Sequence, residues 1–182
     1  MQTTIALFRG INVGGHNKLP MAELRALLTE MGLQDVKSYI QSGNIVFRTN
    51  TPDDDILAEQ ISKAIEDRFG FLPRVLLIGL VAYRKAIAAN PFPDGEDEPK
   101  SLHLYFLTEE PTEPNLALLD EVRKESERFQ LIDDVFYLYA PEGIGRSKLA
   151  ERVERVLGVS VTARNWRSAC KILDLAQQVE DG

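Results

Sequence analysis

Apolar and polar positions along the first 80 residues follow two different periods. Residues 3–9 and 44–49 are short runs rich in apolar and β-branched side chains, which is typical of strands. Leucine and methionine recur at helical spacing between Pro20 and Gly32, and a second apolar stripe with this spacing ends at Gly70. The pattern predicts a strand, a helix, two strands, a helix and a strand, at residues 3–9, 21–31, 36–40, 44–49, 53–69 and 74–78.

The same order of elements can be read a second time along the chain. Residues 80–89 predict a connecting helix, and the proline-rich, acidic residues 90–100 predict an exposed linker. The second series is expected at residues 101–107, 115–126, 129–132, 135–139, 148–157 and 159–162, with a further helix at 165–178. We therefore expect an α+β protein of two tandem ferredoxin-like βαββαβ units with additional helices. The predicted divisions are residues 1–79, 80–100 and 101–182.

Composition restricts the kind of protein that the chain can be, but it indicates no reaction. The chain has 182 residues, one cysteine, two histidines and a formal net charge of −7. It is long enough to fold without disulfides, and it has neither a cleavable signal pattern nor an apolar run that would span a bilayer. These features predict a soluble, cytoplasmic protein. Two histidines and one cysteine are too few for a zinc site, so we expect no metal, and the sequence identifies no cofactor.

The acidic charge is distributed unevenly along the chain. Residues 1–48 contain five basic and three acidic side chains, residues 143–175 contain seven and three, and residues 49–142 contain nine and twenty. The net charge disfavours nonspecific binding to nucleic acid. Because the two glycine-containing loops discussed next lie in the net basic segments, the sequence favours an anionic ligand over a cationic one.

The first candidate site is the glycine-rich stretch at residues 9–15, which has no counterpart in the second half. In the ferredoxin-like order the third strand runs antiparallel beside the first, so residues 9–18 and 41–44 should meet at one end of the sheet. Glycine N–H groups beside a helix start suit an anion, with His16 and Lys18 as further contacts. The candidate ligand-binding residues are Arg9, Asn12, Gly14, Gly15, Gln41, Ser42 and Asn44. The alternative is a tight loop whose polar residues satisfy the loop itself.

The second candidate site lies in the second half, where residues 139–148 and 162–167 should share one end of its sheet. A helix start, arginines and a tryptophan could hold an anion and stack a planar group. The alternative is a helix cap, a salt bridge and a buried tryptophan. If the halves pack so that both loops face one cleft, this cluster completes the first site. Its candidate residues are Arg146, Ser147, Arg164, Asn165 and Trp166.

Three functions remain open from the residues alone. The leading hypothesis is binding of a small anionic or phosphorylated metabolite, nucleotides included. An enzyme acting on such a metabolite is an alternative, with Ser42 and His16 as the candidate nucleophile and base. The other alternative is an RNA-binding or protein-interaction module that uses aromatic sheet faces. That hypothesis depends on aromatic side chains that we expect to share faces, namely Phe8 with Phe47, and His103 and Tyr105 with Tyr137 and Tyr139.

Several of these segments also carry a family resemblance. Residues 6–15, 20–24 and 39–47 resemble a bacterial family known as domain of unknown function 1697, and the segments 146–149 and 162–166 match its further signatures. The resemblance covers nearly all of the chain. It implies a shared fold and indicates which loops matter, but it implies no reaction.

Overall fold

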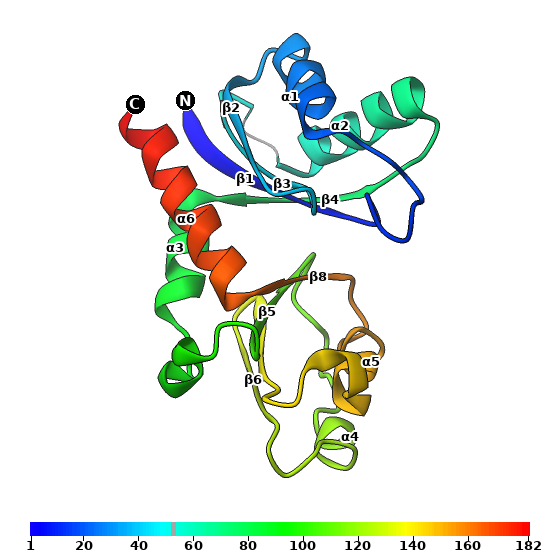
Figure 1. The fold of residues 1–182 in the computed structure, drawn as a ribbon, viewed down its shortest axis with the longest axis vertical. Helices are drawn as coiled ribbons and strands as arrows, with labels where there is room; N and C mark the ends of the chain where they lie inside the picture. The colour runs from blue at the N-terminus through cyan, green and yellow to red at the C-terminus, as the bar shows by residue number, and fades with distance from the viewer. Residues whose placement is uncertain (52–53) are drawn as a thin grey trace. The chain divides into compact units, whose positions relative to one another are not determined.

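The computed structural model describes residues 1–51 and 54–182, and within them the chain forms two four-stranded antiparallel sheets (Figure 1). The first sheet has the order β2-β3-β1-β4 and the second has the order β6-β7-β5-β8. Each sheet has the strand order and connections expected of a βαββαβ unit, so the predicted fold class is confirmed. The elements in the first half of the chain are β1 (Gln2–Arg9), α1 (Met21–Glu30), β2 (Gln34–Tyr39), β3 (Asn44–Thr49), α2 (Asp54–Phe69) and β4 (Arg74–Gly79).

The second half repeats this order and adds helices around it. Its elements are α3 (Leu80–Ala88), η1 (Pro93–Asp97), β5 (Leu102–Leu107), α4 (Ala117–Asp120), β6 (Arg128–Ile132), β7 (Val135–Tyr139), η2 (Ile144–Arg146), α5 (Lys148–Leu157), β8 (Val161–Asn165) and α6 (Trp166–Asp181). The predicted second helix began at Asp53, which lies outside the described residues. Among the helices of residues 1–51 and 54–182, none is both long and apolar enough to cross a lipid bilayer.

Contacts between residues divide the chain into two compact units. The first unit is Met1–Lys85 together with Lys171–Gly182, and the second is Ala86–Cys170. The end of α6 therefore packs with the first unit, where the Thr3 hydroxyl donates a hydrogen bond to the Glu180 carboxylate. Since side chains alternate along a strand, Thr3 lies on the same face of the first sheet as the buried Ile5 and Leu7.

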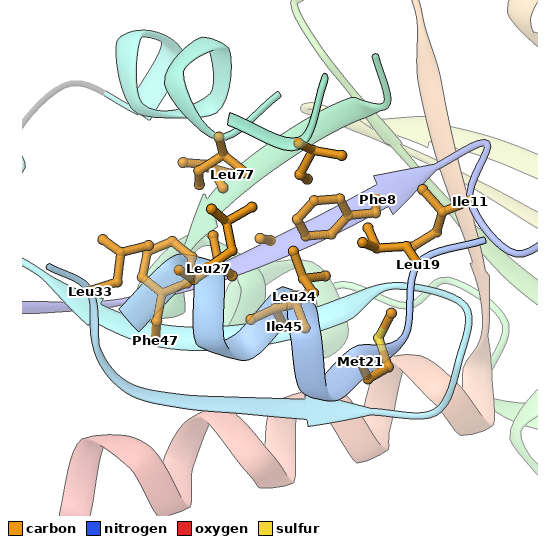
Figure 2. Packing of buried hydrophobic residues seen from close by; sticks show 14 of the residues in the cluster. Phe8, Ile11, Leu19, Met21, Leu24, Leu27, Leu33, Ile45, Phe47 and Leu77 are labelled. Carbon is orange, nitrogen blue, oxygen red and sulfur yellow. The ribbon is translucent and has the colours of Figure 1, made fainter. Parts of the chain in front are cut away.

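The core of the first unit fills the space between one face of its sheet and helices α1 and α2. Phe8 and Leu24 approach each other across this space, and Phe47 lies near Leu27 and Leu33 (Figure 2). The helical spacing of leucines in α1 places them on one buried face, as the sequence pattern predicts. Phe8 and Phe47 do share a sheet face, but both rings are buried beneath the helices.

The aromatic residues of the second sheet do not share one face, contrary to the prediction. In the antiparallel register Tyr105 lies opposite Phe136, and Tyr137 lies opposite Leu104. Tyr105 therefore faces the core beneath α5, while Tyr137 faces the other side and donates a hydrogen bond from its hydroxyl to the Ala86 carbonyl at 2.6 Å. Odd-numbered residues on two different strands need not lie on the same sheet face, because the hairpin sets the register between the strands. Phe8, Phe47, Tyr105 and Tyr137 are buried, so they do not form the exposed platform that the RNA-binding hypothesis requires, and Tyr139 is half-buried.

Two other predicted elements have different bounds in the structure. The helix expected at residues 115–126 is only the single turn α4, because the chain turns back where the Lys124 amide donates to the Glu127 carboxylate. The last strand was expected at residues 159–162, but β8 continues to Asn165, which pairs with His103. In addition, Phe92 and Gly95 are buried within the stretch predicted as an exposed linker. The Arg128 guanidinium lies 5.0 Å from the centre of the Phe92 ring, and the side chains of Tyr139 and Leu102 lie against Gly95.

Candidate functional site

The loop from Gly10 to Leu19, called the glycine loop below, is held in shape by the side chain of Asn12. The Asn12 amide group donates to the carbonyl of Leu19 at 2.9 Å and to that of Gln41 at 2.8 Å, and its oxygen accepts from the Leu19 amide at 2.8 Å. Asn12 has a φ of 53°, a left-handed conformation that asparagine tolerates better than most residues. The bond to Leu19 therefore closes the loop on itself, and the bond to Gln41 fixes the loop on its neighbour.

That neighbour is the turn between β2 and β3. Gly43 has a φ of 76°, and a β-carbon built on it would lie 2.6 Å from side-chain atoms of both Ile11 and Phe8. Only glycine allows the glycine loop to pack this closely on the turn. Asn44 is fully buried and donates from its amide group to the Tyr39 carbonyl at 3.1 Å and to the Ser42 hydroxyl at 3.0 Å. The Asn44 side chain thus stabilises the turn from within.

The tip of the glycine loop, residues 13–18, faces solvent. Val13 is 67% exposed, and Gly14, Gly15, His16 and Lys18 are also exposed. The loop closes through hydrogen bonds from the Asn12 amide to the Asn17 carbonyl and from the His16 amide to the Val13 carbonyl, each 3.0 Å long. Within residues 1–51 and 54–182, nothing accepts a hydrogen bond from the amides of Gly14 and Gly15. The tip therefore offers N–H donors on a backbone whose shape is fixed elsewhere.

Strand pairing places two arginines beside this loop. Arg9, the last residue of β1, lies directly opposite Arg74, the first residue of β4. Arg9 is half-buried and Arg74 is exposed. Arg74 is not among the residues predicted for this site, although the antiparallel order of the first and last strands of the unit predicts that it lies near Arg9.

The structure thus brings the first predicted cluster together and separates its members by role. Asn12 and Asn44 use their side chains within the protein, and the Ser42 hydroxyl accepts a hydrogen bond in the turn. Gly14 and Gly15 lie at the exposed tip with Lys18, while the Gln41 carbonyl anchors the loop. Arg9, Asn12, Gly14, Gly15, Gln41, Ser42 and Asn44 all belong to the glycine loop, to the adjacent turn or to the strand ends that they join.

Most members of the second predicted cluster have structural roles. The Ser147 hydroxyl caps α5 by accepting a hydrogen bond from the Ala150 amide at 3.0 Å, and the Asn165 side chain accepts from the Ser168 amide at 2.9 Å in the first turn of α6. Trp166 is only 7% exposed, so its ring is not available to stack on a ligand. Arg164 donates to the carbonyl of Ala163, and Arg146 is exposed.

His103 lies at this same end of the second sheet, directly opposite Asn165. Its side chain is buried, which lowers its pKa, while the Ser101 backbone opposes the shift in part. Glu127 is buried on the same sheet face, and burial raises the pKa of Tyr105 to about 12, an effect to which the Glu127 charge adds. In the part of the chain that the structure describes, no three metal-ligating side chains of His, Cys, Asp or Glu gather.

Comparison with protein families identifies one family that matches most of this chain. The model of the family described as "Protein of unknown function (DUF1697)" matches residues 1–137, which include the glycine loop and the turn that holds it. The chain belongs to the DUF1697 family. This DUF1697 member is also similar to a solved structure, the conserved bacterial protein SP0830 from Streptococcus pneumoniae, with 25% sequence identity and a TM-score of 0.73. The similarity covers 96% of this chain and 98% of SP0830, whereas comparison with curated proteins gives no match.

Proposed function

We propose that this DUF1697 protein binds a small anionic ligand of the phosphate or carboxylate class, nucleotides included, at the tip of the glycine loop. The observation that carries the proposal is the pair of exposed amides at Gly14 and Gly15, which have no acceptor within the described chain. Successive backbone N–H groups in a concave loop are a common way to bind an anion. The ligand would supply the acceptors that these amides lack.

The rigidity of the glycine loop supports this proposal. Asn12 fixes the loop from inside, and Gly43 lets it pack on the neighbouring turn, so little conformational entropy would be lost when a ligand binds. A loop that had to order around its ligand would bind more weakly for the same contacts.

The charges around the tip also favour an anion. Lys18 and His16 lie on the loop itself, and the opposed Arg9 and Arg74 lie at the end of the strands from which it leaves. A phosphate or carboxylate near these groups would form charge-assisted hydrogen bonds with them.

The proposal is tested by NMR titration of the 15N-labelled full chain with inorganic phosphate, a dicarboxylate and a nucleotide. We expect the amide signals of Gly14 and Gly15 to shift with at least one of them. Ligand at 100 times its dissociation constant should also stabilise the protein by about 2.7 kcal/mol in thermal unfolding.

Two matched lysine variants separate the site from general charge effects. Lys18→Gln should weaken ligand binding several-fold, because it removes a charged partner at the loop tip. Lys37→Gln removes an exposed lysine from β2 and should leave binding unchanged. Equal losses in the two variants, or unmoved Gly14 and Gly15 signals with every anion, would contradict the proposed site.

A further inference from the structure

Helix α2 and the start of β4 form a cleft on the surface of the first unit. Its volume is about 330 Å³, which is large enough for a small molecule. Three residues of α2 and three residues at the start of β4 line it, namely Ala58, Glu59, Ser62, Leu72, Pro73 and Val75. None of these six belongs to the glycine loop or to the turn that holds it, so the cleft is a separate feature.

Most of the wall of this cleft is apolar, and part of it is open to water. Leu72 is 62% exposed, and Ala58 and Val75 are half-buried. The Ser62 hydroxyl donates to the Ala58 carbonyl at 2.9 Å, so its hydrogen is already used within the helix. An apolar group in the cleft would therefore cover carbon atoms that water now contacts, which is favourable.

Glu59 is the charged residue among the six, and it lacks a basic partner. Its side chain is exposed, and within residues 1–51 and 54–182 no basic side chain forms an ion pair with it. Lys63 lies four residues further along α2, the usual spacing for a partner of Glu59. It pairs instead with Glu66 at 2.8 Å and with Asp67 at 3.1 Å. The Glu59 carboxylate is therefore available to a positively charged group in the cleft.

The charged residues next to the lining residues also favour a cation. Asp55 lies one turn before Glu59 on α2, is exposed, and adds a second negative charge on that side of the helix. Arg74 lies between Pro73 and Val75, but successive side chains of a strand point to opposite faces of the sheet. Because Val75 packs against the core beneath α2, the Arg74 side chain leaves from the other face.

We infer that the cleft between α2 and residues 72–75 binds a small organic cation, an amine joined to an apolar body. The apolar body packs on Leu72, Val75 and Ala58, and the ammonium group lies beside the Glu59 carboxylate. About one turn of α2 supplies the whole helical wall, so the cleft fits a small molecule better than a long peptide segment. The inference does not depend on the site proposed at the glycine loop.

The test uses hexylamine, which is protonated at neutral pH, with hexanol and hexanoate as neutral and anionic molecules of the same length. In an NMR titration of the 15N-labelled full chain, hexylamine should shift the amide signals of the lining residues Ala58, Glu59, Ser62, Leu72 and Val75. It should bind about two- to fivefold more tightly than hexanol, which corresponds to one exposed ion pair. Hexanoate should bind more weakly than either. The amides of Gly14 and Gly15 report separately on the other site.

Variants of exposed residues separate the charge from the apolar wall. Glu59→Gln should bind hexylamine and hexanol equally, whereas Glu23→Gln, which changes an exposed glutamate of α1 outside the cleft, should keep the preference for hexylamine. Leu72→Ser should weaken the binding of both molecules several-fold.

The inference is overturned if hexylamine shifts none of the lining amides or binds no better than hexanoate. A preference for hexylamine that persists in Glu59→Gln, or that is lost equally in both glutamate variants, also overturns it.

Discussion

Asn12 illustrates how a polar side chain can belong to a site without touching the ligand. The three hydrogen bonds of its side chain described above go to the backbone of the glycine loop and of the adjacent turn. Its left-handed conformation is part of the same arrangement. In the proposed site Asn12 positions the loop, whereas the contacts to the ligand come from the exposed amides and the basic side chains around them.

Gly43 gives the sharpest prediction for a single residue. Gly43→Ala combines a strained positive φ with a β-carbon 2.6 Å from Ile11 and Phe8, so we expect a loss of about 2–4 kcal/mol in the free energy of unfolding. Gly10→Ala is the matched control, because Gly10 also has a positive φ but has open space around it. It should lose only about 1 kcal/mol. Urea unfolding measures both, and equal losses would show that close packing on the turn is unimportant.

At the scale of elements, the cap of α5 can be tested against a serine within a helix. Ser147→Ala removes the hydroxyl that accepts from the Ala150 amide, and it should cost about 1 kcal/mol. Ser62→Ala lies inside α2, where the serine hydroxyl only bonds the Ala58 carbonyl, and it should be neutral or slightly stabilising. Thermal unfolding compares the two, and an Ser147→Ala protein as stable as the parent would contradict the capping role.

His103 in β5 predicts how stability depends on pH. Burial lowers its pKa in the folded protein below the ordinary value of 6.5, so at acid pH the unfolded chain binds a proton that the folded chain resists. The free energy of unfolding should therefore fall as the pH drops below about 6.5. Tyr105, on the same sheet face, has a pKa of about 12 and does not contribute in this range.

A leucine variant provides the comparison for this pH dependence. The difference in unfolding free energy between His103→Leu and the parent should grow in favour of the variant as the pH is lowered from 8 to 5, because leucine does not bind a proton. Denaturant unfolding at several pH values measures this difference. A constant difference would mean that His103 titrates alike in the folded and unfolded chains.

The elements were largely predictable from local patterns, and the errors have physical causes. The period of apolar residues identified α1, α2 and α5 because each buries one face. The period overestimated the length of α4, since the turn closed by Glu127 depends on a contact made after the helix has ended. It also misplaced the aromatic residues of the second sheet, because strand register is set by the hairpin rather than by position along the chain.

The candidate site was predictable in its location but not in its internal roles. The antiparallel order of β1 and β3 correctly predicted that the glycine loop meets the turn at residues 41–44. The hydrogen bonds that Asn12 and Asn44 make within the protein agree with the alternative given for this loop, in which its polar residues satisfy the loop itself. The sequence could not choose between the two hypotheses, because these bonds depend on backbone conformations reached only in the folded chain. The partner of Arg9 across the strands, Arg74, follows from the same topology that located the loop.

At the scale of the whole molecule, the discontinuity of the first unit predicts the effect of a truncation. Removing residues 171–182 deletes the part of α6 that packs with this unit, including Glu180, the partner of Thr3. We expect faster amide hydrogen exchange in β1 and β3, with larger effects there than in β5 and β7. Hydrogen exchange followed by mass spectrometry measures this, and equal protection in the truncated and full chains would contradict the assignment of these residues to the first unit.

The interrupted path of the chain also affects the order in which the protein can mature during translation. Newly made proteins commonly fold from the amino terminus onward, one domain after another. Here the ribosome must synthesise all of Ala86–Cys170 before it reaches the segment that finishes the earlier unit. The first unit therefore begins to form first and is completed last. Until residues 171–182 have been synthesised, the face of its sheet that carries Ile5 and Leu7 is incompletely covered.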